Sequence, residues 1–235
     1  MADSIESFFS SNYGIIYETG GGLKDYSSVI FNNDWKFLHG DVKNAHSVSF
    51  NDRTWKRVDL PHDWVIGQPF CRGEQGGYTA QNMQGFFAWK GVCWYRKEFT
   101  LPQTGGKTVY ICFGGAYRNS TVYVNGKEAG GRASGYSSFQ LDISAFVKDG
   151  RNLIAVRLDN GCEEPDRWYS GSGLYRNVFL RIVPETHIKT WGVHVKPELS
   201  ANKKQAEITV TTTIVSRGTG EGGVACLRLL DSGGN

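Results

Sequence analysis

Residues 163–169 hold the residue types best suited to binding a polar ligand. Asp166, Arg167 and Trp168 follow one another there, in a long segment rich in glycine and aromatic residues. Sugars are recognised by polar groups that hydrogen-bond their hydroxyls and by aromatic faces that pack on their C–H groups. The segment therefore predicts a ligand-binding loop. A structural interpretation stays open, in which Asp166 pairs with Arg167 and the aromatic rings simply pack.

A second group of such residues is His62, Asp63 and Trp64, after Pro61. A histidine beside an aspartate suggests acid–base chemistry, because a carboxylate can orient an imidazole. Adjacent residues of an extended segment point to opposite faces, however, so His62 and Asp63 are poorly placed to bond each other. Two interpretations remain: a packed turn that holds the domain together, or a position for Asp63 or His62 at the rim of a ligand pocket.

Residues 79–91 form a third candidate segment, because they combine an amide with several aromatic rings. Asn82 is followed there by Phe86, Phe87 and Trp89. Exposed rings of this kind provide a stacking platform or a contact with another domain. The alternative is an ordered loop that packs on its own domain.

The elements that must position these loops are predicted to be β-strands. Short apolar runs alternate with turn residues, the pattern of a sandwich or barrel. The clearest runs are residues 108–113, 121–124, 152–158 and 177–183. Asn125 and Gly126 follow the second run and predict a tight hairpin, because both residues accept a positive φ.

The pattern changes near Pro184, where a second group of strands begins. Residues 187–195, 207–215 and 224–230 are its apolar runs, and apolar and polar residues alternate through residues 208–214. Alternation predicts a sheet with one buried face and one polar face. Three strands cannot enclose a sandwich core by themselves, so we expect an incomplete second β domain.

Composition excludes several classes of function. The net charge of the 235 residues is only +3, and Lys203-Lys204 is the longest basic pair, so no nucleic-acid partner is expected. No apolar run approaches the length of a membrane span, and residues 1–14 do not resemble a signal peptide, which leaves the compartment open. The five cysteines have no C-x-x-C spacing, so neither a metal site nor a redox site is predicted.

Four segments in this order resemble the N-terminal sugar-binding domain of glycoside hydrolase family 2, the β-galactosidase and β-glucuronidase group. The resemblance covers residues 31–183, and the part after Pro184 is similar to the start of the immunoglobulin-like domain that follows in that family. The segments are Asp34-Trp35-Lys36-Phe37 with Gly40-Asp41, residues 59–64, residues 94–99, and residues 167–177, supported by residues 119–126.

The resemblance implies an all-β chain with a galactose-binding-like jelly-roll β-sandwich over residues 31–184. An N-terminal arm (1–30) precedes it, and a truncated immunoglobulin-like β-sandwich (185–235) follows. In the family a (β/α)8 barrel carries the two catalytic glutamates, about 5 to 5.5 Å apart in a retaining enzyme. No residue here corresponds to either glutamate. We therefore expect a non-catalytic fragment that supports the barrel and completes its sugar site; whether to call it an enzyme is left open. The alternative is a free-standing carbohydrate-binding module.

The resemblance also implies roles for particular residues. Asp166 matches an aspartate that contributes to the substrate site and to a bound monovalent cation in the large β-galactosidases, so such a cation is expected only in the full-length enzyme. Asn82 is the counterpart of a family asparagine that reaches the sugar. The expected substrate-binding residues are Asp166, Arg167, Trp168, Asp63 and Asn82. Expected partners are carbohydrate and the downstream barrel, without a cofactor in this chain; a homo-oligomer and the identity of the glycoside are left open.

Overall fold

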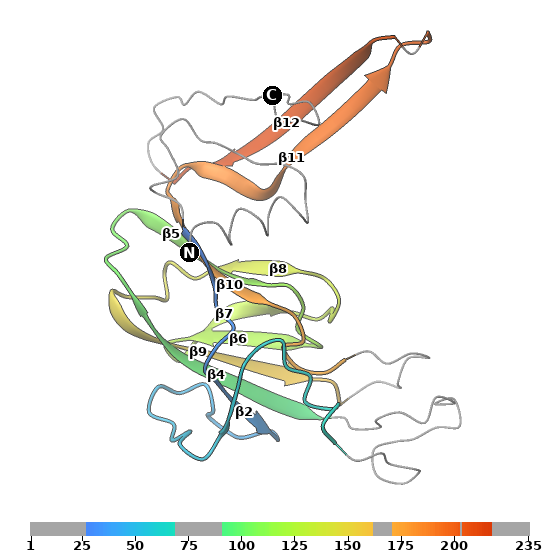
Figure 1. Cartoon of the computed structure of the whole chain (residues 1–235). Helices are drawn as coiled ribbons and strands as arrows, with labels where there is room; N and C mark the ends of the chain where they lie inside the picture. Colours follow the sequence, from blue (N-terminus) through green and yellow to red (C-terminus); the bar gives the residue numbers. More distant parts are fainter. Residues whose placement is uncertain (1–26, 69–90, 162–170, 203, 218–235) are drawn as a thin grey trace, which may run out of the picture. The chain divides into compact units, whose positions relative to one another are not determined.

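The computed structural model describes residues 27–68, 91–161, 171–202 and 204–217 (Figure 1). These residues form strands, turns and loops and contain no helix, which confirms the prediction of an all-β chain. The strands are β1 (Ser27–Ile30), β2 (Trp35–His39), β3 (Lys56–Val58), β4 (Val92–Leu101), β5 (Lys107–Phe113), β6 (Ser120–Val124), β7 (Lys127–Arg132), β8 (Phe139–Asp142), β9 (Gly150–Asp159), β10 (Val178–Pro184), β11 (His187–Leu199) and β12 (Ala206–Val215).

Two sheets make the sandwich of the unit Ser28–Arg181. One has six strands in the order β3-β2-β4-β9-β6-β7, and the other has four in the order β1-β10-β5-β8. Apolar side chains of both sheets are buried, which places the core between them. The fully buried members include Tyr95, Val122, Ile154 and Leu158 of the six-stranded sheet and Val109, Ile111 and Phe113 of the four-stranded sheet.

The hairpin predicted at Asn125-Gly126 is confirmed. Strands β6 and β7 pair on either side of it, and both turn residues have positive φ, 50° for Asn125 and 83° for Gly126. The Asn125 side chain also donates to the carbonyl of Phe146 at 2.9 Å and to the Asn152 side chain at 2.8 Å. The turn is therefore tied to the loop that enters β9.

Residues 27–30, the end of the expected N-terminal arm, form β1 beside β10. The neighbouring Phe31 N–H donates to the carbonyl of Val178 at 2.8 Å and extends this contact. The β-branched pair Val29-Ile30 suits a strand. A segment of four residues, with polar and glycine-rich residues before it, is too short to be recognised by its pattern.

The second unit begins at Ile182, and its described strands are the antiparallel pair β11 and β12. Val195 opposes Val210 and Pro197 opposes Ile208 on one face, whereas Lys196 opposes Thr209 on the other. Apolar and polar residues therefore alternate between the two faces, but the predicted burial of the apolar face is not seen among the described residues, since Val195, Ile208 and Ile214 are 41%, 40% and 51% exposed. The domain boundaries expected at 30/31 and 184/185, and the immunoglobulin-like character of the second unit, remain predictions.

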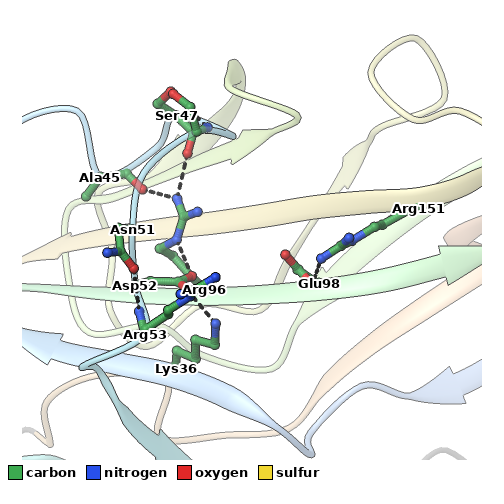
Figure 2. A network of polar contacts seen from close by, with 10 residues as sticks. Lys36, Ala45, Ser47, Asn51, Asp52, Arg53, Arg96, Glu98 and Arg151 are labelled. Atoms are coloured by element: carbon green, nitrogen blue, oxygen red, sulfur yellow. Dashed lines mark hydrogen bonds and ion pairs between the residues drawn. The ribbon is translucent and has the colours of Figure 1, made fainter.

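Residues 40–55 cover the outer face of β4, where a buried polar network holds them (Figure 2). The side chain of Arg96 is only 2% exposed, and its Nε donates to Asp52 Oδ2 at 2.8 Å. The guanidinium also bonds the carbonyls of Ala45 and Ser47. Lys36 Nζ donates to the other Asp52 oxygen at 2.5 Å.

The charges of this network match one another. Burial alone would raise the pKa of Asp52, but the hydrogen bonds and positive charges of Lys36 and Arg96 lower it below its usual value. The Arg96 guanidinium also lies 5.5 Å from the ring centre of Phe50 and 6.0 Å from that of Trp55. Because Asp52 is bound to two cations inside the fold, we assign this cluster to stability and not to ligand binding.

Candidate functional site

Asp63 lies in a short segment that runs beside residues 172–174. The N–H of His62 donates to the carbonyl of Leu174 at 2.9 Å, and the N–H of Trp64 donates to that of Ser172 at 3.2 Å. On the other side, Tyr117 and Gly173 exchange two backbone hydrogen bonds of 3.0 and 3.1 Å. The segment that directly follows residues 162–170 is therefore fixed between the Asp63 segment and Tyr117.

The residue Asp63 is half-buried and lies between the two hydrogen-bonded residues His62 and Trp64. Its Oδ1 accepts a hydrogen bond from the N–H of Val65 at 3.2 Å. Its Oδ2 is 3.6 Å from the position that a Cβ atom on Gly171 would occupy. Asp63 therefore stands next to the first described residue after the segment that carries Asp166.

The hydroxyl of Tyr95 holds the two segments together from inside the sandwich. It lies 2.8 Å from His62 Nδ1 and donates to the carbonyl of His62 at 3.3 Å. Gly173 passes so close that a Cβ atom there would lie 2.3 Å from this hydroxyl, and its φ of +105° favours glycine as well. Burial raises the pKa of Tyr95 well above its usual value, so the hydroxyl keeps its proton.

His62 is a neutral, packed histidine. Burial, together with the charge of Lys56, lowers its pKa to about 4, and its ring packs edge-on against Phe37 at 4.8 Å. A general acid or base works best with a pKa near the operating pH. The packed-turn interpretation therefore holds for His62, while a position of Asp63 at the rim of a ligand pocket remains a prediction.

Asn160 binds Gly91, which follows segment 69–90, and Ser172, which lies just after segment 162–170. Its Oδ1 accepts the N–H of Gly91 at 2.7 Å, and its Nδ2 donates to Ser172 Oγ at 2.7 Å. Its own N–H donates to the carbonyl of Gly91 at 3.2 Å. The described residues that flank segments 69–90 and 162–170 thus meet around Asp63, His62 and Gly173.

Of the five predicted binding residues, the structure places Asp63. Asn82, Asp166, Arg167 and Trp168 lie outside the described residues, as do Phe86, Phe87 and Trp89, so their roles remain predictions. Tyr95, Gly173 and Asn160 were missed as supports of the site. Tyr95 and Gly173 stand inside two of the segments that carry the family resemblance, and this was the available signal.

The described part of the chain holds neither a metal-binding cluster nor a membrane-spanning helix. Within residues 27–68, 91–161, 171–202 and 204–217, no group of three or more histidine, cysteine, aspartate or glutamate side chains could hold a metal ion. The same residues contain no helix that is long and apolar enough to cross a membrane. The cation expected near Asp166 in a full-length enzyme is not tested by this observation and remains a prediction.

Comparison with known proteins adds to this geometry. Residues 77–184 match the family model of the sugar-binding domain of glycosyl hydrolases family 2. The chain is 40% identical over 207 residues to the β-galactosidase BoGH2A of Bacteroides ovatus, which covers 87% of this chain and 24% of the relative. It is 37% identical over 185 residues to a putative β-glucuronidase of Formosa agariphila, or 78% of this chain and 17% of the relative.

The fold agrees with solved structures. A β-glycosidase from Bacteroides vulgatus superposes with a TM-score of 0.76 at 38% identity, over 83% of this chain and 25% of that protein. The chain thus spans a quarter or less of the length of each of these three proteins. The residues matched by the family model include Tyr95 and Gly173 and run from β4 to β10 of the β-sandwich, whereas Asp63 lies before them. The chain therefore belongs to glycosyl hydrolase family 2, of which it carries the sugar-binding domain.

Proposed function

We propose that this chain is the non-catalytic sugar-binding part of a retaining family 2 glycosidase. It supports the catalytic part of the longer protein and contributes loop residues to the sugar site. Asp63, Asn82, Asp166, Arg167 and Trp168 are the residues we propose for that contribution, with a galactoside or a glucuronide as substrate. A monovalent cation near Asp166 belongs to the same proposal.

One observation carries the proposal: the flanks of both candidate loops meet around Asp63. Gly91 and Ser172 are both bound to Asn160, and Trp64 is hydrogen-bonded to Ser172. A rigid sandwich that gathers loops at one place is a common way to build a binding site. The free-standing module receives less support, because the relatives extend far beyond the matched region.

The chemistry of glycoside hydrolysis explains why we assign sugar binding to this chain and bond cleavage to the rest of the longer protein. A retaining enzyme needs a carboxylic acid that protonates the leaving group and a carboxylate that attacks the sugar. The polar network at Asp52 is bound to Lys36 and Arg96, and His62 is neutral and packed. These groups are committed to the fold. In the proposed role, Asp63 holds a sugar hydroxyl in place as a hydrogen-bond acceptor.

The test is hydrolysis of 4-nitrophenyl β-galactoside and 4-nitrophenyl β-glucuronide by the 235-residue chain. We expect no release of nitrophenol above the uncatalysed rate. Turnover by the purified chain that disappears in Asp166→Ala or Asp63→Asn would contradict the proposed division, because it would place the catalytic groups within this chain.

A further inference from the structure

A cluster of aromatic and cationic side chains adjoins the candidate site at Gly171. We define the tyrosine–arginine patch as Tyr117, Arg118, Tyr136, Tyr175 and Arg176. A Cβ atom on Gly171 would lie 3.5 Å from the ring of Tyr175 and 3.6 Å from the Asp63 carboxylate. Gly171 therefore separates the patch from Asp63 by the width of one backbone segment.

The patch is a rigid surface, because its tyrosines are fixed to neighbouring backbone and to one another. The hydroxyl of Tyr175 donates to the carbonyl of Gly135 at 2.9 Å. The backbone of Gly135 lies against the ring of Tyr117, so closely that a Cβ atom there would be 2.2 Å from that ring. Tyr136 follows directly and packs on Tyr117, with 5.4 Å between ring centres and 66° between planes. Its side chain remains accessible, since the residue is 44% exposed.

Two guanidinium groups lie over these rings. Arg118 Cζ is 5.9 Å from the ring centre of Tyr117, and Arg176 Cζ is 5.3 Å from that of Tyr175. Arg176 also donates to the carbonyl of Gly114 at 3.4 Å, which holds its exposed side chain beside the patch. Cations placed over aromatic faces are stabilised by the electrostatic attraction of the ring. Tyr117 is buried, at 8% exposure, and supports Tyr136 from below, so the accessible part of the patch combines the ring of Tyr136 and the half-buried Tyr175 with the donors of the two arginines.

We propose that the tyrosine–arginine patch binds a second pyranose ring of an oligosaccharide whose first ring lies at Asp63. The proposal rests on the proposed function, which places a sugar at Asp63. Tyrosine provides a flat apolar face and a polar edge at little entropic cost, and a guanidinium donates in pairs to hydroxyl or carboxylate oxygens.

The small exposed part of the patch favours a saccharide over a protein partner. A specific protein interface buries about 800 Å² on each partner. Among the patch residues, Tyr136 is the one with a large exposed hydrophobic side chain, and the exposed hydroxyls of Ser134 and Ser138 adjoin it. A surface of rings, hydroxyls and guanidinium groups matches the alternating C–H and O–H faces of a sugar.

The test compares a monosaccharide with longer probes on the full 235-residue chain. The probes are methyl β-galactoside, β-linked galactotriose and a trisaccharide that contains glucuronic acid, titrated by calorimetry and by amide NMR. In Tyr136→Ala we expect affinity for at least one trisaccharide to fall about 5- to 10-fold, the loss of one aromatic contact. Affinity for the monosaccharide stays within about twofold, since its ring does not reach Tyr136.

Controls separate this inference from the proposed function. Trp191→Ala removes another exposed aromatic side chain, in the second unit, and is expected to change neither affinity. Arg176→Gln is a second patch variant, at an exposed position, and is expected to weaken trisaccharide binding as well. The inference is overturned if wild type and both patch variants bind the trisaccharides with equal affinity and the amide shifts are confined to the region of Asp63. That result leaves the proposed function intact. If no probe shifts any amide of either region, both the inference and the sugar contact at Asp63 are refuted.

Discussion

Replacing Asp52 by alanine leaves the Arg96 guanidinium buried without its negative partner. Arg96 is 2% exposed and cannot turn to water while the fold is intact. Breaking a buried ion pair from one side typically costs 3 to 5 kcal/mol, about 3 kcal/mol here because Arg96 keeps its bonds to the Ala45 and Ser47 carbonyls. Lys36 is 28% exposed and can reach solvent, so it adds little to the loss.

The assay is urea unfolding followed by tryptophan fluorescence, because Trp55 and Trp94 are buried in the cluster that covers the network. With a urea m-value of about 1 to 3 kcal/mol per molar, a loss of about 3 kcal/mol lowers the midpoint by about 1 to 3 M. Glu98→Ala is the matched control, since the Arg151–Glu98 pair is exposed on both sides, 75% and 51% (Figure 2). The free energy of unfolding of Glu98→Ala is expected to stay within about 1 kcal/mol of the wild-type value. Equal shifts in the two variants would refute this account of the network.

The pH dependence of stability is an independent test of the ion pair between Asp52 and Arg96. The folded-state pKa of Asp52 is lowered, so its contribution to stability is present above the unfolded value of about 3.9 and is lost as the pH falls through the folded value. Below pH 4 the free energy of unfolding should therefore fall less steeply in Asp52→Ala than in the wild type. An unchanged acid dependence in the variant would show that Asp52 does not titrate as an ion-paired group.

Three further outcomes are expected around Tyr95. Gly173→Ala should lower the melting temperature by about 5 °C or more, since a methyl group would overlap the Tyr95 hydroxyl at a positive φ; a melting curve within 1 °C of wild type would contradict that geometry. Tyr95→Phe leaves His62 Nδ1 without this partner and should cost about 1 to 3 kcal/mol by urea unfolding, and an unchanged midpoint would argue against the hydrogen bond. The ring of His62 should titrate near pH 4 in NMR spectra, and because the unfolded chain takes up this proton at about 6.5, stability should fall as the pH drops from about 6.5 to about 4 and then level. A midpoint near 6.5 in the folded chain would contradict the burial of His62.

Much of the sandwich could be predicted from local pattern, and the rest depended on contacts between distant residues. Asn125-Gly126 predicts a hairpin because the turn is decided by two adjacent residues. Strand β7 contains Glu128, Gly130 and Gly131, and β3 has only three residues, so neither has an apolar pattern of its own. These strands exist because β6 and β2 offer backbone partners.

In the candidate site, too, adjacent residues could be predicted from the sequence and contacts between distant residues could not. Asp63 could be found because histidine, aspartate and tryptophan follow one another in one segment. Its supports could not, since Tyr95 acts on His62 across 33 positions, and Asn160 acts on Gly91 across 69. Likewise, Arg96 and Asp52 are 44 positions apart, and sequence alone does not reveal that a segment folds back over β4 to bring them together.

The most direct test of the central claim, that the segments around Asp63 hold a sugar, is an amide NMR titration of the chain with methyl β-galactoside and methyl β-glucuronide. Saturable shifts at Asp63, Gly171 and Gly173 with one of the two sugars, lost in Asp63→Asn while the melting temperature is kept, are the predicted result. Shifts that are absent with both sugars, or that arise only at sites remote from these residues, would contradict the account.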